Sequence, residues 1–182
     1  MAITAASSSV GIAAIEIAKA EGAISIATTR KSNKKAELLS LGAHHVIVTE
    51  EEDLVARVKQ ITAGRGARVI LDPVAGPFLE KLAEAAAPGG IIFESGALSI
   101  EPTPFPLFMA IRKGLNIRGY SLMEITRNPE KLRAAKKYVY DRLADGRFHP
   151  KVAKIFPLAK TVEAYKYLES NEQVGKIVIT VR

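Results

Sequence analysis

Three consecutive serines stand where an apolar strand pattern changes into a helix pattern. Ala2–Ala5 can form a short strand and Val10–Glu21 a helix rich in Ala and Ile, with Ser7-Ser8-Ser9 between them. The first N–H groups of a helix have no partner inside the helix, so together with serine hydroxyls they can hold the phosphates of a dinucleotide. The same serines can instead serve only to cap the helix, and the residues alone leave both interpretations open.

The glycine pattern around this turn is incomplete. When the chain is aligned on Gly11, Ala6 and Ser8 stand where a dinucleotide-binding fingerprint has its first two glycines. Gly11 itself is retained, and a glycine at that position lets the helix pack closely against the strand. The fingerprint therefore does not by itself decide between a phosphate site and a capped helix.

A cluster of cations follows the second apolar run. A fold that binds NAD ordinarily carries Asp or Glu about twenty residues after the first glycine, where the carboxylate binds the ribose 2′-hydroxyl. Here the run ends at Thr29 and Arg30 with no acid, and Lys34 lies one turn into the next helix. Arg30 can stack on adenine and bind a phosphate with its forked guanidinium, while Lys34 adds a point charge. Lys31 and Lys35 complete the cluster, and helix geometry turns one of them outward.

The cluster has an ordinary alternative, which is a solvated basic helix start. Cations at a helix N-terminus oppose the helix dipole, and this disfavours that alternative. A bound dianionic 2′-phosphate would offset the repulsion. The sequence therefore predicts NADP (NADPH) as the cofactor.

Strand patterns rich in Ile and Val alternate with helix patterns along most of the chain, and the connections are short. This order predicts an α/β fold, a doubly wound parallel sheet (Rossmann fold) with helices on both faces. The strands that we expect are Ala2–Ala5, Ile24–Thr28, His45–Val48, Ala67–Asp72, Gly90–Ser95 and Asn116–Gly119. The helices that we expect among them are Val10–Glu21, Lys34–Leu41, Leu54–Ala63, Pro77–Ala87 and Phe105–Lys113.

The pattern changes after Gly119. A long helix is expected from Pro129 to Asp145, and it is followed by an extended stretch, a helix and a last strand. We therefore divide the chain into a dinucleotide-binding domain of residues 1–150 and a C-terminal helix–strand appendage of residues 151–182. The last three elements are expected at Lys151–Phe156, Leu158–Ser170 and Lys176–Val181.

Composition excludes several classes of function. The absence of cysteine excludes disulfides, thiolate nucleophiles and cysteine-based zinc sites, and the three histidines lack metal-ligand spacing, so no metal site is predicted. The net charge of +7 comes from cations spread over many helices with few aromatics, which predicts a solvated basic surface and no nucleic-acid partner. No apolar run reaches membrane-spanning length and no signal peptide follows Met1, so we expect a cytoplasmic protein without a membrane partner.

Several blocks resemble one family in the right order along nearly the whole chain. The runs ITAASSSVGIAAIEIAKAEGA, ATTRKSNKKAELLSLGAHHVI, ARVILDPVAGP, PGGIIFESGALS and YLESNEQVGKIVITV resemble the cofactor domain of the medium-chain dehydrogenase/reductase superfamily. Within it they are most similar to the zinc-independent quinone oxidoreductase branch, whose members are often labelled zinc-type alcohol dehydrogenases. The AASSSVG block resembles the AxxGxxG turn of that branch, with Ser8 in place of the middle glycine.

The resemblance implies a set of cofactor contacts. Those at the pyrophosphate are Ser8, Ser9, Val10 and Gly11, and those around the adenosine ribose and its 2′-phosphate are Thr29, Arg30 and Lys34. Those near the ribose and adenine are Asp72, Pro73 and Val74, and those beside the nicotinamide are Ser95, Gly96, Ala97 and Leu98. Asn171 and Lys176 are further candidates for the cofactor cleft.

Three of the residues in this region have ordinary structural alternatives. Asp72 precedes Pro73 and can simply end a strand. Gly96 can be only a turn glycine. Glu94 lies near the site by position, but we expect it to be solvated or paired.

The resemblance also implies what the chain does and what it lacks. Members of the branch carry an N-terminal catalytic domain, whereas this chain begins at the first strand of the cofactor domain, and residues from about Lys151 would pack with the absent domain. We therefore expect the NADPH-binding domain of an oxidoreductase that transfers a hydride between NADPH and a quinone or an activated alkene or carbonyl, inactive alone. The alternative is a non-catalytic NADPH-binding sensor or scaffold.

No catalytic residue is assigned. Tyr120 is the one phenol near a strand end, and we expect it to be a packed side chain. The small-molecule substrate belongs to the full-length parent. The family further implies a homodimer formed through the edge strand near Asn116–Tyr120.

Overall fold

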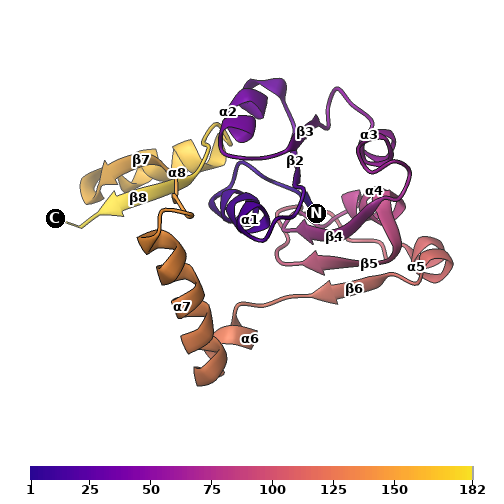
Figure 1. The fold of residues 1–182 in the computed structure, drawn as a ribbon. Helices are drawn as coiled ribbons and strands as arrows, with labels where there is room; N and C mark the ends of the chain where they lie inside the picture. The colour runs from indigo at the N-terminus through magenta and orange to yellow at the C-terminus, as the bar shows by residue number, and fades with distance from the viewer. Residues whose placement is uncertain (182) are drawn as a thin grey trace.

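A parallel sheet lies at the centre of the protein (Figure 1). The structure is a computed structural model and describes residues 1–181. Its six strands run in the order β3-β2-β1-β4-β5-β6, and each neighbouring pair is parallel. The strands are β1 (Ala2–Ile3), β2 (Ile26–Thr29), β3 (His45–Val48), β4 (Ala67–Asp72), β5 (Ala86–Glu94) and β6 (Asn116–Gly119).

Helices cover both faces of this sheet. On one face, α1 (Ser9–Ala20) and α2 (Lys35–Ser40) pack Ile15 and Leu38 against β1, β2 and β3. On the other face, α3 (Leu54–Ile61) and α4 (Phe78–Ala85) build the larger core, and Met109 of α5 (Leu107–Lys113) packs against it. The predicted doubly wound α/β fold is therefore confirmed.

The boundaries differ from the predictions where tertiary contacts override the local pattern. β1 ends at Ile3 instead of Ala5, because Ala5 takes a positive φ of 44° and turns the chain toward the serines. α4 ends at Ala85 and β5 begins at Ala86 instead of Gly90, because Ala86 is extended and pairs with Ala67. α2 begins at Lys35, and Lys34 ends a short 3₁₀ turn (Ser32–Lys34) that precedes it.

The C-terminal part forms a second, smaller unit. After α6 (Met123–Thr126) and α7 (Pro129–Ala144), β7 (Val152–Pro157) pairs in parallel with β8 (Lys176–Thr180). Between these strands lie a 3₁₀ turn (Leu158–Lys160) and α8 (Thr161–Glu169). This unit of β7, α8 and β8 sits beside α1 and α2 and away from β5 and β6 (Figure 1).

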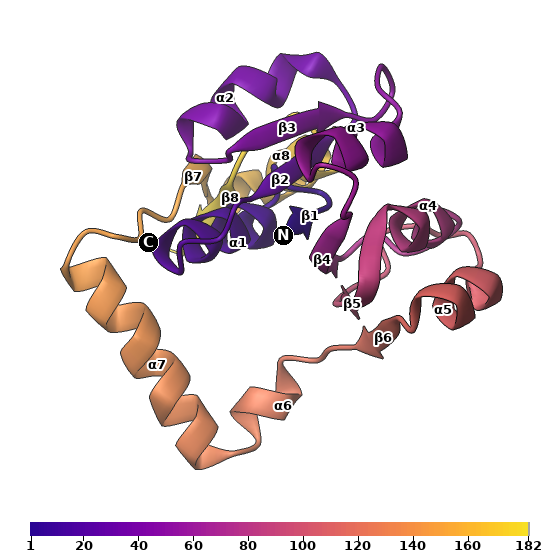
Figure 2. The same ribbon diagram turned by 45° about the vertical axis from the view of Figure 1, so that its right-hand side comes forward.

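The helix α7 stands away from the central sheet (Figure 2) and is attached to α1 by side chains near its C-terminal end. The guanidinium of Arg142 donates to Glu21 at 3.0 Å and lies 3.4 Å from the centre of the Tyr138 ring. The Tyr138 hydroxyl donates to the same carboxylate oxygen of Glu21 at 2.6 Å. Among residues 1–181 no helix has both the length and the apolar character that crossing a membrane requires.

Candidate nucleotide-binding site

The turn before α1 provides the N-cap of the helix and leaves one backbone amide without an acceptor. Ser8 is the N-cap, and its hydroxyl oxygen accepts the N–H of Gly11 at 3.0 Å. The amide of Val10 has no acceptor within residues 1–181, whereas the amide of Ser9 faces the carbonyl of Gly175 in an isolated parallel bridge between Ser8 and Gly175. The capping interpretation of the serines is therefore confirmed for Ser8. The phosphate interpretation stays a prediction, for which the open amide of Val10 at the helix N-terminus provides a donor.

Gly11 is required by the close approach of α1 to the chain that leaves β1. A Cβ atom at this position would lie 2.5 Å from the Cα atom of Ala6 and 2.7 Å from the carbonyl oxygen of Ala5. Both are backbone atoms and neither can move aside. The retained glycine thus sets the distance between the helix N-terminus and the sheet, as its place in the fingerprint predicts.

The two predicted phosphate cations lie near each other but differ in their partners. The Arg30 carbonyl accepts from Glu50, while its guanidinium is exposed at the end of β2 and has no partner in the described chain. The Lys34 ammonium donates to Ser7 Oγ at 3.2 Å, to the Gln173 carbonyl at 3.0 Å and to the Asn171 carbonyl. Burial lowers the pKa of Lys34, and the charge of Arg30 lowers it further.

Thr29 has a supporting place in this corner of the site. Its side chain is buried, and the hydroxyl donates to the carbonyl of Lys31 at 3.3 Å. The contact closes the turn that presents Arg30. The prediction that Thr29 lies at the adenosine ribose stays a prediction, and in this structure its hydroxyl donor is used within the chain.

The surroundings of Asp72 differ from those expected of a residue at the ribose and adenine. It is fully buried, and its carboxylate accepts the amides of Val74 and Ala75 at 2.9 Å each and the hydroxyl of Thr4. A carboxylate without solvent exposure and with these donors cannot contact a ribose. Asp72 instead ends β4 and holds the loop that carries Pro73 and Val74, which was the ordinary alternative.

The loop after β5 lies against the loop after β4. The amide of Ser95 donates to the Asp72 carbonyl at 2.8 Å, and the amide of Leu98 donates to the Pro73 carbonyl at 3.0 Å. A Cβ atom at Gly96 would come within 2.9 Å of the Pro73 carbonyl oxygen, so this glycine allows the two loops to touch. Gly96, Ala97 and Leu98 are exposed along this edge.

Glu94 differs from its prediction, since it is neither solvated nor paired. Both of its carboxylate oxygens are buried and have no hydrogen-bond partner within residues 1–181. Burial, and after it the negative charge of Asp72, raises the pKa of Glu94 to about 7. The sequence signal for this group was an acid at the last position of a strand otherwise made of apolar residues.

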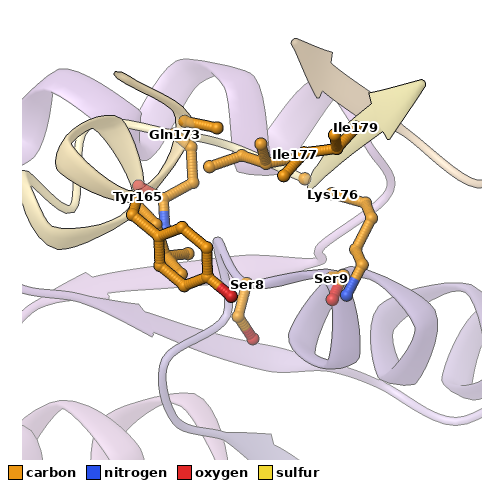
Figure 3. A pocket seen from close by; sticks show the side chains of 10 residues that line it. Ser8, Ser9, Tyr165, Gln173, Lys176, Ile177 and Ile179 are labelled. Atoms are coloured by element: carbon orange, nitrogen blue, oxygen red, sulfur yellow. The ribbon is translucent and has the colours of Figure 1, made fainter. Parts of the chain in front are cut away.

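A cavity of about 270 Å³ opens between the phosphate turn and the C-terminal unit (Figure 3). Ser8 and Ser9 form one wall, and Tyr165 of α8 and Lys176 of β8 face them from the other side. Lys176 was a further candidate for the cofactor cleft, whereas Tyr165 was missed because its exposed place on α8 resembles an ordinary surface tyrosine. The cavity, Arg30 and the loops after β4 and β5 share the edge where the parallel strands end, at the switch in strand order between β1 and β4, which is where such sheets bind ligands.

The comparisons with known proteins agree with this arrangement. A family model described as zinc-binding dehydrogenase matches residues 9–137. The chain belongs to this family. The predicted membership in the medium-chain dehydrogenase/reductase superfamily is confirmed, and so is the similarity to its quinone oxidoreductases.

Curated members of the family align over nearly the whole chain. The chain is 32% identical to quinone oxidoreductase 1 of Escherichia coli over 178 residues, which are 96% of this chain and 54% of that protein. It is 28% identical to 2-haloacrylate reductase of a Burkholderia species, over 97% of this chain and 54% of that protein. The chain thus spans about half the length of these relatives.

Solved structures of the family superpose closely. The E. coli quinone oxidoreductase in complex with NADPH matches with a TM-score of 0.90 at 31% identity, over 98% of this chain and 56% of that one. The 2-haloacrylate reductase structure matches with a TM-score of 0.88 at 28% identity, over 100% of this chain and 57% of that one.

The zinc in the family name has no donor set in this part of the chain. Within residues 1–181, His, Asp and Glu side chains nowhere gather in a group of three that could hold a metal ion, and the sequence contains no cysteine. The residues present do not fit a zinc site.

Proposed function

We propose that this chain is the NADPH-binding domain of an oxidoreductase in which a hydride passes between the nicotinamide and a quinone or an activated alkene or carbonyl. The observation that carries the proposal is the open amide of Val10 at the start of α1, with the exposed Arg30 at the end of the adjacent strand β2. This donor and this cation suit a pyrophosphate and a 2′-phosphate. The E. coli relative solved with NADPH supports the choice of nucleotide.

The residues of this chain would bind and orient the nucleotide. The amide of Val10 and the hydroxyl of Ser9 would hold the pyrophosphate, with Lys176 facing Ser9 across the cavity. Arg30 would bind the 2′-phosphate. The exposed loop Gly96–Leu98 would border the nicotinamide, which supplies the hydride, and Gly96 would keep this loop close to Pro73.

We expect turnover to need a part of the full-length protein that lies outside this chain. The chain covers about half the length of its relatives, and we propose that residues 151–182 pack with the catalytic part of the full protein. We also propose a homodimer formed through β6, which has a neighbour on one side only and ends next to Tyr120. The competing function is a sensor that binds NADPH without reacting it, and NADPH oxidation by the full-length protein with quinones would exclude that function.

Calorimetric titration with NADPH and with NADH tests the proposal. We expect NADPH to bind more tightly, and Arg30→Ala to reduce that advantage by roughly 1–3 kcal/mol without affecting NADH, because only NADPH carries the 2′-phosphate. Lys81→Ala, which removes an exposed cation on α4, is the matched control and should leave both affinities unchanged. Absence of binding of either nucleotide would contradict the proposal.

A further inference from the structure

Two carboxyl groups are neighbours on one face of the sheet, at the C-terminal ends of β4 and β5. Ile70 pairs with Ile92, and both belong to the larger core that α3 and α4 build. Side chains two residues apart in a strand point to the same face, so Asp72 and its partner Glu94 follow them on that face. Neighbouring strands are about 4.8 Å apart, so two buried negative charges at this place would repel each other strongly.

The charges around Glu94 leave Asp72 as the one that acts on it. On β6 a glycine lies opposite Glu94, and Arg118 lies over the ring of Phe93, 5.8 Å from its centre. The ammonium of Lys113 on α5 donates to a carbonyl at the start of β5, which is the other end of the strand. Burial, and after it the charge of Asp72, raises the pKa of Glu94 to about 7. The charged residues of α4 and of the loop after β5 are exposed: Glu80, Lys81, Glu84 and Glu101.

The carboxylate of Asp72 also supports the loops after β4 and β5. It accepts the amides of Val74 and Ala75 at 2.9 Å each. The carbonyl of Val74 in turn accepts the amide of Ser99 in the second loop at 2.9 Å. Glu94 directly precedes this second loop in the chain. A displacement of either carboxyl group would therefore move both loops.

We propose that Glu94 is a positioning residue for the nicotinamide end of the cofactor site: its uncharged form lets the loops after β4 and β5 lie together, and its ionised form drives them apart. The part concerning the nucleotide rests on the proposed function, whereas the coupling of Glu94 to the loops does not. Val10 and Arg30, which would bind the phosphates, follow β1 and β2 and lie outside these loops. Ionisation of Glu94 should therefore weaken binding of the nicotinamide and leave binding of the adenosine phosphates unchanged.

The first test is calorimetric titration at pH 6 and at pH 8 with NADPH and with 2′-phospho-ADP-ribose, which has the same phosphates and no nicotinamide. With a pKa of about 7, Glu94 is protonated in about nine-tenths of the molecules at pH 6 and in about one-tenth at pH 8. Because only this form keeps the loops in place, the ratio of the NADPH affinity to the 2′-phospho-ADP-ribose affinity should fall about tenfold. The ratio removes the titration of the 2′-phosphate, which both ligands share. A ratio that does not change with pH would overturn the proposal.

A neutral side chain of the same shape should abolish this pH dependence. We expect Glu94→Gln to keep the same ratio at pH 8 as at pH 6. Glu101→Gln, which changes an exposed acid of the neighbouring loop, is the matched control and should retain the full tenfold fall. If Glu94→Gln does not fold, Glu94→Met removes the same charge at a similar length. A tenfold fall that persists without the Glu94 carboxyl would mean that another group causes it, and the proposal would be wrong.

The second test is amide hydrogen exchange without nucleotide, at the amides of Leu98 and Ser99 that join the second loop to the first. Their protection, measured relative to the intrinsic rate at each pH, should fall between pH 6 and pH 8 in the wild type and stay constant in Glu94→Gln. Constant protection in the wild type would overturn the role of Glu94 whether or not the chain binds a nucleotide. A wild type that binds neither ligand would contradict the proposed function and leave this experiment to decide the role of Glu94.

Discussion

Glu94 of β5 and Asp72 of β4 are paired in the register of the parallel sheet, so two carboxyl groups lie side by side where the strands end. They have different surroundings. Asp72 accepts hydrogen bonds from Thr4, Val74 and Ala75, whereas the oxygens of Glu94 are buried without a partner. The fold therefore satisfies the charge of one acid, and it favours the protonated form of the other.

The first prediction concerns the pH dependence of stability. The pKa of Glu94 is about 7 in the folded chain against an ordinary 4.5, so the folded state holds a proton that the unfolded state releases. Its contribution makes the free energy of unfolding fall as pH rises from about 4.5 to about 7. Glu94→Gln should therefore be more stable than the wild type at pH 8, by about 1 kcal/mol after allowance for solvent screening, and nearly equal to it at pH 4.

Urea unfolding of both proteins across this pH range measures the difference. Glu80→Gln, which changes an exposed acid on α4, is the control and should give the same difference at every pH. A Glu94→Gln curve parallel to that of the wild type would show that the buried carboxyl does not titrate in this range.

The second prediction concerns the support of the loop after β4. Asp72→Ala leaves the Val74 and Ala75 amides and the Thr4 hydroxyl without their acceptor, and it should reduce the free energy of unfolding by about 3 kcal/mol. Thr4→Val removes one donor only and should cost about 1 kcal/mol. Thermal or urea unfolding checks both values. Equal effects of the two substitutions would mean that the amide contacts contribute little.

The third prediction concerns the contact of α1 with the chain after β1. Gly11→Ala places a methyl group against the backbone of Ala5 and Ala6, which should cost about 1–3 kcal/mol of stability and displace the open amide of Val10. Nucleotide affinity should fall together with stability. Gly119→Ala is a suitable control, because no atom lies within 4 Å of a Cβ there. Full affinity in Gly11→Ala would show that the helix N-terminus does not need this close packing.

The fourth prediction concerns the attachment of α7. The hydrogen bond from Tyr138 holds the pKa of Glu21 below its ordinary value, and the charge of Arg142 contributes to this effect. The stabilisation is present above the ordinary carboxyl pKa and is lost as pH falls through the lowered value. The protection of the amides of residues 129–144 against exchange, measured relative to the intrinsic rate at each pH, should therefore fall in acid, and Glu21→Gln should show low protection already at neutral pH.

A control on the same helix isolates this contact. Asp141→Asn breaks the exposed pair of Asp141 with Lys137, within α7 itself, and should leave exchange in the helix near the wild-type rate. If it accelerates exchange as much as Glu21→Gln does, the helix is sensitive to any loss of charge and Glu21 does not anchor it.

The fold was predictable because its signals are local. The alternation of apolar strands and amphipathic helices, and Gly11 next to the serine turn, are features of neighbouring residues that the structure confirms. The strand β5 was predicted too short for the opposite reason. Its first residue, Ala86, pairs with Ala67 of β4, and such a partner leaves no trace in the local pattern.

The sequence predicted which residues lie at the candidate site, but not the hydrogen-bond partners that they have there. Lys34 was predicted to lie at the adenosine ribose and its 2′-phosphate, and the sequence did not show that its ammonium also donates to the distant carbonyls of Asn171 and Gln173. Asp72 was taken for a ligand contact for a similar reason, since its partner Thr4 lies far away in the chain. Arg30 stays a predicted 2′-phosphate ligand, and its side chain is exposed at the end of β2.

The two-residue strand β1 has a consequence for how the chain reaches its fold. Ala2 pairs with Ile26 on one side and with Ile70 on the other, and Ile3 likewise joins Ala27 to Leu71. Residues that are synthesised early thus acquire one of their partners only after β4 has been made. Because distant pairings must first close long loops, we expect the middle of the sheet to form late during folding. Until then the edges of β2 and β4 are unpaired, so a newly made chain is most prone to aggregation during this interval.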